Sequence, residues 1–88
     1  MRITQVKILR TGGSDLVAYA NFTIDDCFRV RDLRLFRTPT GYYIAMPRVK
    51  EKDGQYREVV YPLNPKTRKA IEEAVIAEYE KVVGKRAR

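Results

Sequence analysis

An uninterrupted alternation of apolar and more polar side chains runs from Leu16 to Ile24. One parity of this segment holds Leu16, Ala18, Ala20, Phe22 and Ile24. Successive side chains of a β-strand point to opposite faces of a sheet, so the pattern predicts a strand with one face in a hydrophobic core. A sheet with one apolar face needs a second layer of structure that covers this face.

Residues 2–10 predict another strand, since Thr4, Val6 and Ile8 share one face of it. The turn formers of residues 11–15 include two glycines, which supply the positive φ that a tight hairpin needs. The first two predicted strands therefore form an antiparallel hairpin.

The alternation changes phase inside the next predicted strand, Cys27–Phe36. Phe28 and Val30 have one parity, whereas Leu33 and Leu35 have the other. One extra residue near Arg31 and Asp32 restores the register, so we predict a β-bulge there. With the bulge, all the arginines of this strand that lie before Phe36 face solvent, namely Arg29, Arg31 and Arg34. Two roles remain open for them, pairing with acidic residues on a neighbouring strand and contact with phosphate groups.

The short apolar segment from Gly41 to Arg48 predicts a strand over 42–46 that ends at Pro47, which has no backbone N–H. Tyr42, Ile44 and Met46 fall on one face, and Tyr43 and Ala45 on the other. Because both faces are largely apolar, the pattern predicts a central strand with a neighbour on each side.

After Pro47 the sequence predicts a charged hairpin and then a helix. Asp53-Gly54 is a strong turn signal, and a strand over 58–61 is expected to pair with 44–49. Asn64 as N-cap and Pro65 in the first helical position mark the start of a helix that runs to Val83. Its predicted apolar stripe consists of Ile71, Ala74, Val75, Tyr79 and Val82.

The 88 residues are enough for one domain, which we place at 1–84, followed by a basic tail at 85–88. A single cysteine, Cys27, and the absence of histidine argue against a disulfide framework, a metal site and most catalytic machinery. Asp25-Asp26 and Glu72-Glu73 are expected in a turn and on an exposed helix face. We therefore expect no enzymatic activity, no cofactor and no small-molecule substrate. No segment predicts a membrane span or a signal peptide, so a cytoplasmic location is expected.

The formal charge of +7 is the strongest hint of function, because a small basic domain attracts polyanions and most often nucleic acid. The alternative is that the charge serves solubility alone. The candidate nucleic-acid contacts follow Pro47 and are Arg48, Lys50, Lys52, Arg57, Lys66 and Lys69.

Several motifs together resemble the stage V sporulation protein G (SpoVG) family. They are Met1-Arg2-Ile3-Thr4, Phe28-x-Val30-x-Asp32-x-Arg34, Gly41-Tyr42-Tyr43-Ile44-Ala45-Met46-Pro47, Asp53-Gly54-Gln55-Tyr56-Arg57 and Tyr61-Pro62-Leu63-Asn64. The resemblance covers residues 1 to about 83. One departure is Tyr61, since family members often carry histidine before this proline.

The resemblance implies an α+β fold, in which a small twisted antiparallel sheet carries a single C-terminal helix and forms a homodimer by strand exchange or sheet pairing. It also implies a regulator of septation, cell division or sporulation that binds DNA, and RNA in some members. The alternative is a protein-interaction module of division or septum formation that binds no nucleic acid. Tyr19, Tyr43 and Tyr56 suit such an interface, although ordinary half-buried packing in the sheet is the favoured explanation for them.

Overall fold

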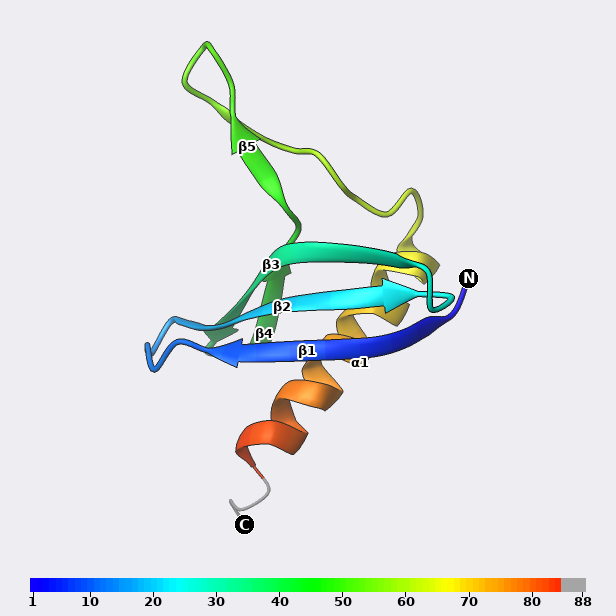
Figure 1. The fold of residues 1–88 in the computed structure, drawn as a ribbon. Helices are drawn as coiled ribbons and strands as arrows, with labels where there is room; N and C mark the ends of the chain where they lie inside the picture. The colour runs from blue at the N-terminus through cyan, green and yellow to red at the C-terminus, as the bar shows by residue number, and fades with distance from the viewer. Residues whose placement is uncertain (85–88) are drawn as a thin grey trace.

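The computed structural model describes residues 1–84, and the predicted basic tail at 85–88 lies outside this part of the chain. An antiparallel sheet of four strands carries a C-terminal helix on one face, and a separate two-stranded hairpin stands away from the sheet (Figure 1). The predicted α+β architecture is therefore confirmed. The elements are β1 (Ile3–Arg10), β2 (Leu16–Ile24), β3 (Phe28–Thr38), β4 (Gly41–Ala45), β5 (Arg48–Lys50), β6 (Tyr56–Glu58) and α1 (Pro65–Val83).

The strands of the main sheet lie in the order β1-β2-β3-β4, so each one pairs with its neighbour along the chain. This order places β4 at an edge of the sheet, and the prediction that residues 42–46 form a central strand is wrong. Ile44 and Met46 are buried in the core, but Tyr43 on the opposite face is exposed. The apolar run reflects cover from the helix layer and not a second neighbouring strand.

The predicted bulge in β3 is confirmed. Ala20 of β2 pairs with Leu33, and two residues later Phe22 pairs with Val30, three residues back along β3. Asp32 takes up the extra length with a φ of 70°, in the left-handed region that aspartate tolerates better than most residues. Val30, Leu33 and Leu35 consequently share the buried face. The arginines at 29, 31 and 34 are all exposed, as predicted.

A second irregularity lies at the start of β2. Leu16 pairs with Phe36, and Ala18 pairs with Leu35, so β2 has an extra residue at Val17. Val17 is buried in the core, whereas Leu16 is only half-buried. The predicted apolar face of this strand is thus correct from Ala18 onwards and wrong at Leu16.

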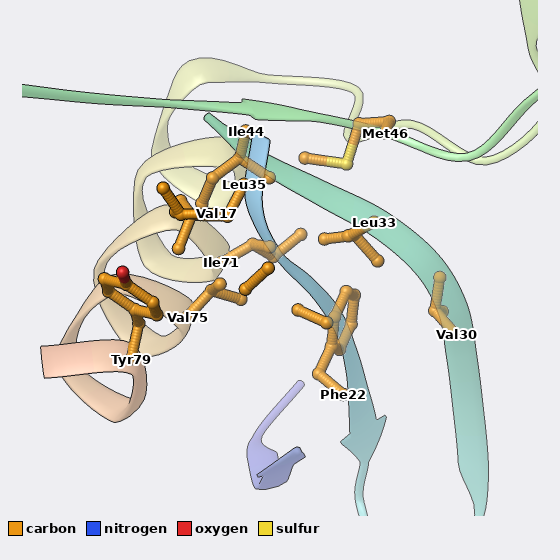
Figure 2. Close-up of a cluster of buried hydrophobic side chains, with 12 residues drawn as sticks. Val17, Phe22, Val30, Leu33, Leu35, Ile44, Met46, Ile71, Val75 and Tyr79 are labelled. Carbon is orange, nitrogen blue, oxygen red and sulfur yellow. The ribbon is translucent and has the colours of Figure 1, made fainter. Parts of the chain in front are cut away.

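Helix α1 covers the apolar face of the sheet. Figure 2 shows Ile71, Val75 and Tyr79 among the core side chains of the strands. The Tyr79 ring also meets Tyr42 edge-on, with 5.8 Å between the ring centroids. The predicted stripe is confirmed at Ile71, Val75 and Tyr79, whereas Ala74 is half-buried and Val82 is exposed. Ile76 and Val83, which were not predicted, pack against the core.

The helix boundaries follow the predicted signals. The Asn64 side chain accepts a hydrogen bond of 2.8 Å from the backbone N–H of Thr67, and Pro65 opens the first turn. Gly84 ends the helix, and its N–H donates to the carbonyl of Glu80. No helix among residues 1–84 has the length and apolar character needed to cross a membrane.

Strands β5 and β6 form a hairpin that points away from the main sheet (Figure 1). Gly54 has a φ of 87° at the turn, so the predicted turn is confirmed. The predicted pairing of 58–61 with 44–49 is correct only at Arg48 and Glu58, because the hairpin pairs Arg48–Lys50 with Tyr56–Glu58. Every residue from 48 to 61 is exposed, so the hairpin has no core of its own.

Replacing Leu33 by alanine tests the core. Leu33 is 0% exposed, so Leu33→Ala should lower the free energy of unfolding by about 2–5 kcal/mol. Leu9 is 69% exposed, so the matched control Leu9→Ala should change the free energy of unfolding by less than about 0.5 kcal/mol. Urea unfolding followed by circular dichroism measures both values. Equal losses in the two variants would contradict the placement of the core.

Candidate nucleic-acid interface

The predicted contacts of the hairpin do not all lie on one face. Arg48 pairs with Glu58 and Lys50 with Tyr56, so these residues share one face of the hairpin. Arg57 pairs with Val49 and lies on the other face, because side-chain direction alternates along a strand. Lys52 sits in the turn and is exposed. The hairpin thus offers Arg48, Lys50 and Lys52 as cations, with Glu58 beside Arg48.

Arg57 is the weakest of the predicted contacts. Its Nε lies 2.6 Å from Oε1 of Glu51, and its Nη2 lies 3.3 Å from Oδ2 of Asp53. These carboxylates hold the guanidinium within the hairpin and offset its charge. Arg57 therefore supports the shape of the hairpin turn, which the sequence pattern alone did not indicate.

Lys66 and Lys69 project from the first two turns of α1 and are exposed. Residues 59–64 connect the hairpin to the helix, and Figure 1 shows the hairpin extending away from the helix start. Within one molecule the helix lysines and the hairpin cations consequently form two separate groups. Their closeness in sequence therefore does not bring these candidate contacts together in one molecule.

Among the helix, the hairpin and the strands of the main sheet, the strands have the largest excess of basic over acidic side chains. The hairpin has four basic and three acidic side chains between 48 and 58, and α1 has four of each kind. Strands β1–β4 hold a single acidic residue, Asp32, against Lys7, Arg10, Arg29, Arg31, Arg34 and Arg37. The candidate contacts named from the sequence all follow Pro47 and therefore leave out these cations of the strands.

Most of these sheet cations lie on the face opposite α1, which we call the open face. Its basic and aromatic side chains follow from the register of the strands and comprise Lys7, Tyr19, Arg29, Arg31, Arg34, Phe36 and Tyr43. Three of these arginines were recognised from the sequence but not included among the candidate contacts. Lys7 and Tyr19 alternate with the core residues of their strands, and this alternation is the sequence signal that would have placed them on the same face as the arginines.

The open-face arginines contact neutral partners. Arg29 donates hydrogen bonds to Oγ1 of Thr23 at 3.3 Å and to Oε1 of Gln5 at 3.2 Å. The guanidinium of Arg34 lies 5.8 Å from the centroid of the Tyr19 ring. Within residues 1–84 the ion pairs involve only Arg57, Arg68 and Lys81 among the cations. Pairing with acids on a neighbouring strand, one of the two roles considered for these arginines, therefore does not occur.

A third group of cations lies on the face of the sheet that α1 covers. Arg10 and Arg37 line a hollow together with Tyr79. A hydrogen bond to Tyr79 and the nearby Tyr42 raise the pKa of Arg37, whose guanidinium lies 5.8 Å from the Tyr42 ring centroid. These contacts therefore favour the charged form of Arg37.

The adjacent carboxylates Asp25 and Asp26 form the turn between β2 and β3, as predicted. Both have positive φ, 51° and 58°, and Oδ1 of Asp25 accepts a hydrogen bond of 2.9 Å from the N–H of Arg2. The Thr4 hydroxyl accepts a second one from the N–H of Asp26. These contacts give the pair a structural role in joining the turn to the start of β1.

The chain is similar to proteins of one named family. A family model described as SpoVG matches residues 1–81. A relative from Bdellovibrio bacteriovorus is 43% identical over 81 residues, covering 92% of this chain and 75% of the relative. Others come from Anaeromyxobacter sp. strain Fw109-5, with 41% identity over 87 residues and coverages of 99% and 90%, and Myxococcus xanthus, with 42% over 81 residues and coverages of 92% and 82%. All three carry the name "Putative septation protein SpoVG".

Arg57→Ala tests whether the hairpin is a separate unit. The ion pairs of Arg57 are exposed, so the global free energy of unfolding should fall by less than about 1 kcal/mol. Hydrogen exchange at the amides of Glu51 and Gly54, which close the turn, should become faster. Exchange at Leu33 in the core is the internal control. Equal acceleration at all three amides would show that the hairpin opens only together with the sheet.

Proposed function

Since this chain belongs to the SpoVG family, three members of which are named as septation proteins, we propose that it is a dimeric regulator of septation, cell division or sporulation that binds DNA or RNA with sequence preference. We propose further that it binds without catalysing a reaction and acts in the cytoplasm.

The observation that supports nucleic-acid binding most directly is the unneutralised positive charge. The formal charge is +7, and in the described part of the chain only three cations have an acidic partner. Phosphate backbones supply the complementary charge, and their release of counterions makes such binding favourable. The exposed cations of β5 and of the turn, Arg48, Lys50 and Lys52, stand on an element that reaches away from the core. An element of this shape is accessible to a bulky polymer.

Dimerisation is supported by two features that are incomplete in one molecule. The β5–β6 hairpin has no buried residue, and an isolated two-stranded hairpin is only marginally stable in water. The edge of β4 that faces away from β3 has no neighbouring strand among residues 1–84. A second copy of the chain would support the hairpin or extend the sheet, and two-fold symmetry would make both contacts reciprocal.

An apolar groove provides a third argument for the dimer. It lies between the end of the sheet and the connection to α1, with a volume of about 310 Å³. Phe28 and Leu63 line it and are 62% and 87% exposed. Apolar side chains gathered in this way mark protein contact sites. The groove also favours the alternative, a protein-interaction module, if its occupant is another protein.

The hairpin and the helix start can be compared directly as nucleic-acid contacts. Replacing Arg48, Lys50 and Lys52 by alanine should weaken binding to duplex DNA and lower the salt dependence of the logarithm of the binding constant by up to about 0.9 per lost phosphate contact. Lys66→Ala with Lys69→Ala tests the helix in the same way. Fluorescence anisotropy over a salt series measures both. Absence of binding by the unchanged protein at low salt would overturn the proposed function and leave the protein-interaction module.

The dimer is tested by mass. Light scattering at micromolar concentration should give twice the 10.3 kDa of one chain. Leu63→Asp should shift the equilibrium towards the monomer, because burying an unpaired carboxylate in an apolar contact is unfavourable. Leu9→Asp introduces the same charge on the open face and should leave the mass unchanged. A monomer mass for the unchanged chain would exclude the dimer.

A further inference from the structure

The open face has a central row that crosses all four strands. Leu9 of β1 pairs with Tyr19 of β2, Tyr19 pairs with Arg34 of β3, and Arg34 pairs with Ala45 of β4. Tyr19 is 37% exposed and lies beside the Arg34 guanidinium, which is 5.8 Å from the centre of its ring. A planar aromatic ring with an adjacent planar cation therefore occupies the middle of the face.

Two hollows flank this ring. One has a volume of about 490 Å³ and is bordered by Lys7, Asn21 and Arg31 in addition to Tyr19. The other has a volume of about 200 Å³ and is bordered by Arg34 and Arg48, with Tyr19 again on its edge. Each hollow thus joins the same aromatic ring to cations on its outer border. Asp32 borders both hollows and is the single acidic side chain of strands β1–β4.

A pair of aromatic rings lies on the open face near the β4 edge of the sheet. Phe36 of β3 pairs with Tyr43 of β4, and the centroids of their rings are 6.3 Å apart. Tyr43 is exposed, so its ring also presents a surface to solvent. The open face therefore carries exposed aromatic rings as well as unneutralised cations.

This combination matches an unpaired nucleic-acid strand better than a duplex. In a single strand the faces of the bases are free to stack on aromatic rings, while phosphates contact the surrounding cations. In a duplex the bases are already stacked on one another, and the major groove admits a helix or a two-stranded ribbon and not the broad face of a four-stranded sheet. The open face offers rings for stacking on a surface too broad for a groove.

We propose that the open face binds single-stranded nucleic acid, with a base stacked on Tyr19 and phosphates held by Lys7, Arg29, Arg31 and Arg34. The proposal rests on the proposed nucleic-acid function and specifies both the surface and the form of the ligand. The apolar groove proposed for dimerisation is lined by Phe22 and Ile71, which belong to the helix side of the sheet. A dimer formed through that groove would leave the open face accessible.

Substitution of Tyr19 tests the stacking contact. Tyr19→Ala should weaken binding of a labelled single-stranded 12-mer about tenfold, whereas Tyr19→Phe, which keeps the ring, should bind within about twofold of the unchanged protein. Tyr56→Ala removes an exposed tyrosine that pairs with Lys50 on the hairpin and serves as the comparison for that surface, with a smaller loss expected than in Tyr19→Ala. Arg34→Gln should weaken the same binding and lower its salt slope by about 0.7. Circular dichroism confirms that each variant is folded.

A fluorescent reporter gives an independent readout, because the chain contains no tryptophan. In Tyr19→Trp the new indole should be quenched when unlabelled single-stranded oligothymidine binds, and in Tyr56→Trp it should not. An unchanged affinity in Tyr19→Ala, an equal loss in Tyr56→Ala, or quenching at position 56 alone would overturn the proposal. If duplex DNA still binds in that case, the proposed function stands and only the open-face inference fails. If neither form of nucleic acid binds the unchanged protein, both fail.

Discussion

The extra residue of β3 determines what each face of the sheet becomes. Without it, Leu33 and Leu35 would point away from α1, and the strand would divide its apolar side chains between two faces. The positive φ of Asp32 restores the phase, so that Val30, Leu33 and Leu35 all meet the helix layer. The same shift places Arg34 on the open face, together with Arg29 and Arg31. Core formation and the concentration of charge on the open face are therefore two results of one local irregularity.

The helix completes only one side of the sheet. Ile71, Val75 and Tyr79 bury the apolar face, and the opposite face stays in contact with water. Polar side chains can line that opposite face because an antiparallel sheet can have one face in contact with water. The hairpin adds a third surface, which shares no core with the other two. The molecule thus has a packed interior, a cationic aromatic face and a projecting hairpin, and Arg48 of the hairpin borders the same hollow as Tyr19 and Arg34 of the open face.

Local patterns predicted much of the fold. The alternation in β2, the phase change in β3, the Asp53-Gly54 turn and the Asn64-Pro65 helix start each depend on neighbouring residues, and each was located correctly. The errors concern relations between distant segments. The apolar run Tyr42–Met46 would look the same in a central strand and in an edge strand packed against a helix. The edge position of β4 was therefore missed. The candidate site was predicted only in part for a similar reason. The sequence does not show which carboxylates pair with Arg57, or that Lys66 lies apart from the hairpin.

The strand order also has a consequence for the route by which the chain folds. Every pairing in the main sheet joins segments that are adjacent in sequence, and such local contacts form rapidly. Helix α1, however, lies against β1 and β2, at the opposite end of the chain. The sheet can therefore assemble while its apolar face is still uncovered, and α1, which is synthesised after all the strands, closes the structure. Until α1 docks, the nascent chain presents a surface on which chaperones, or other unfinished chains, can bind.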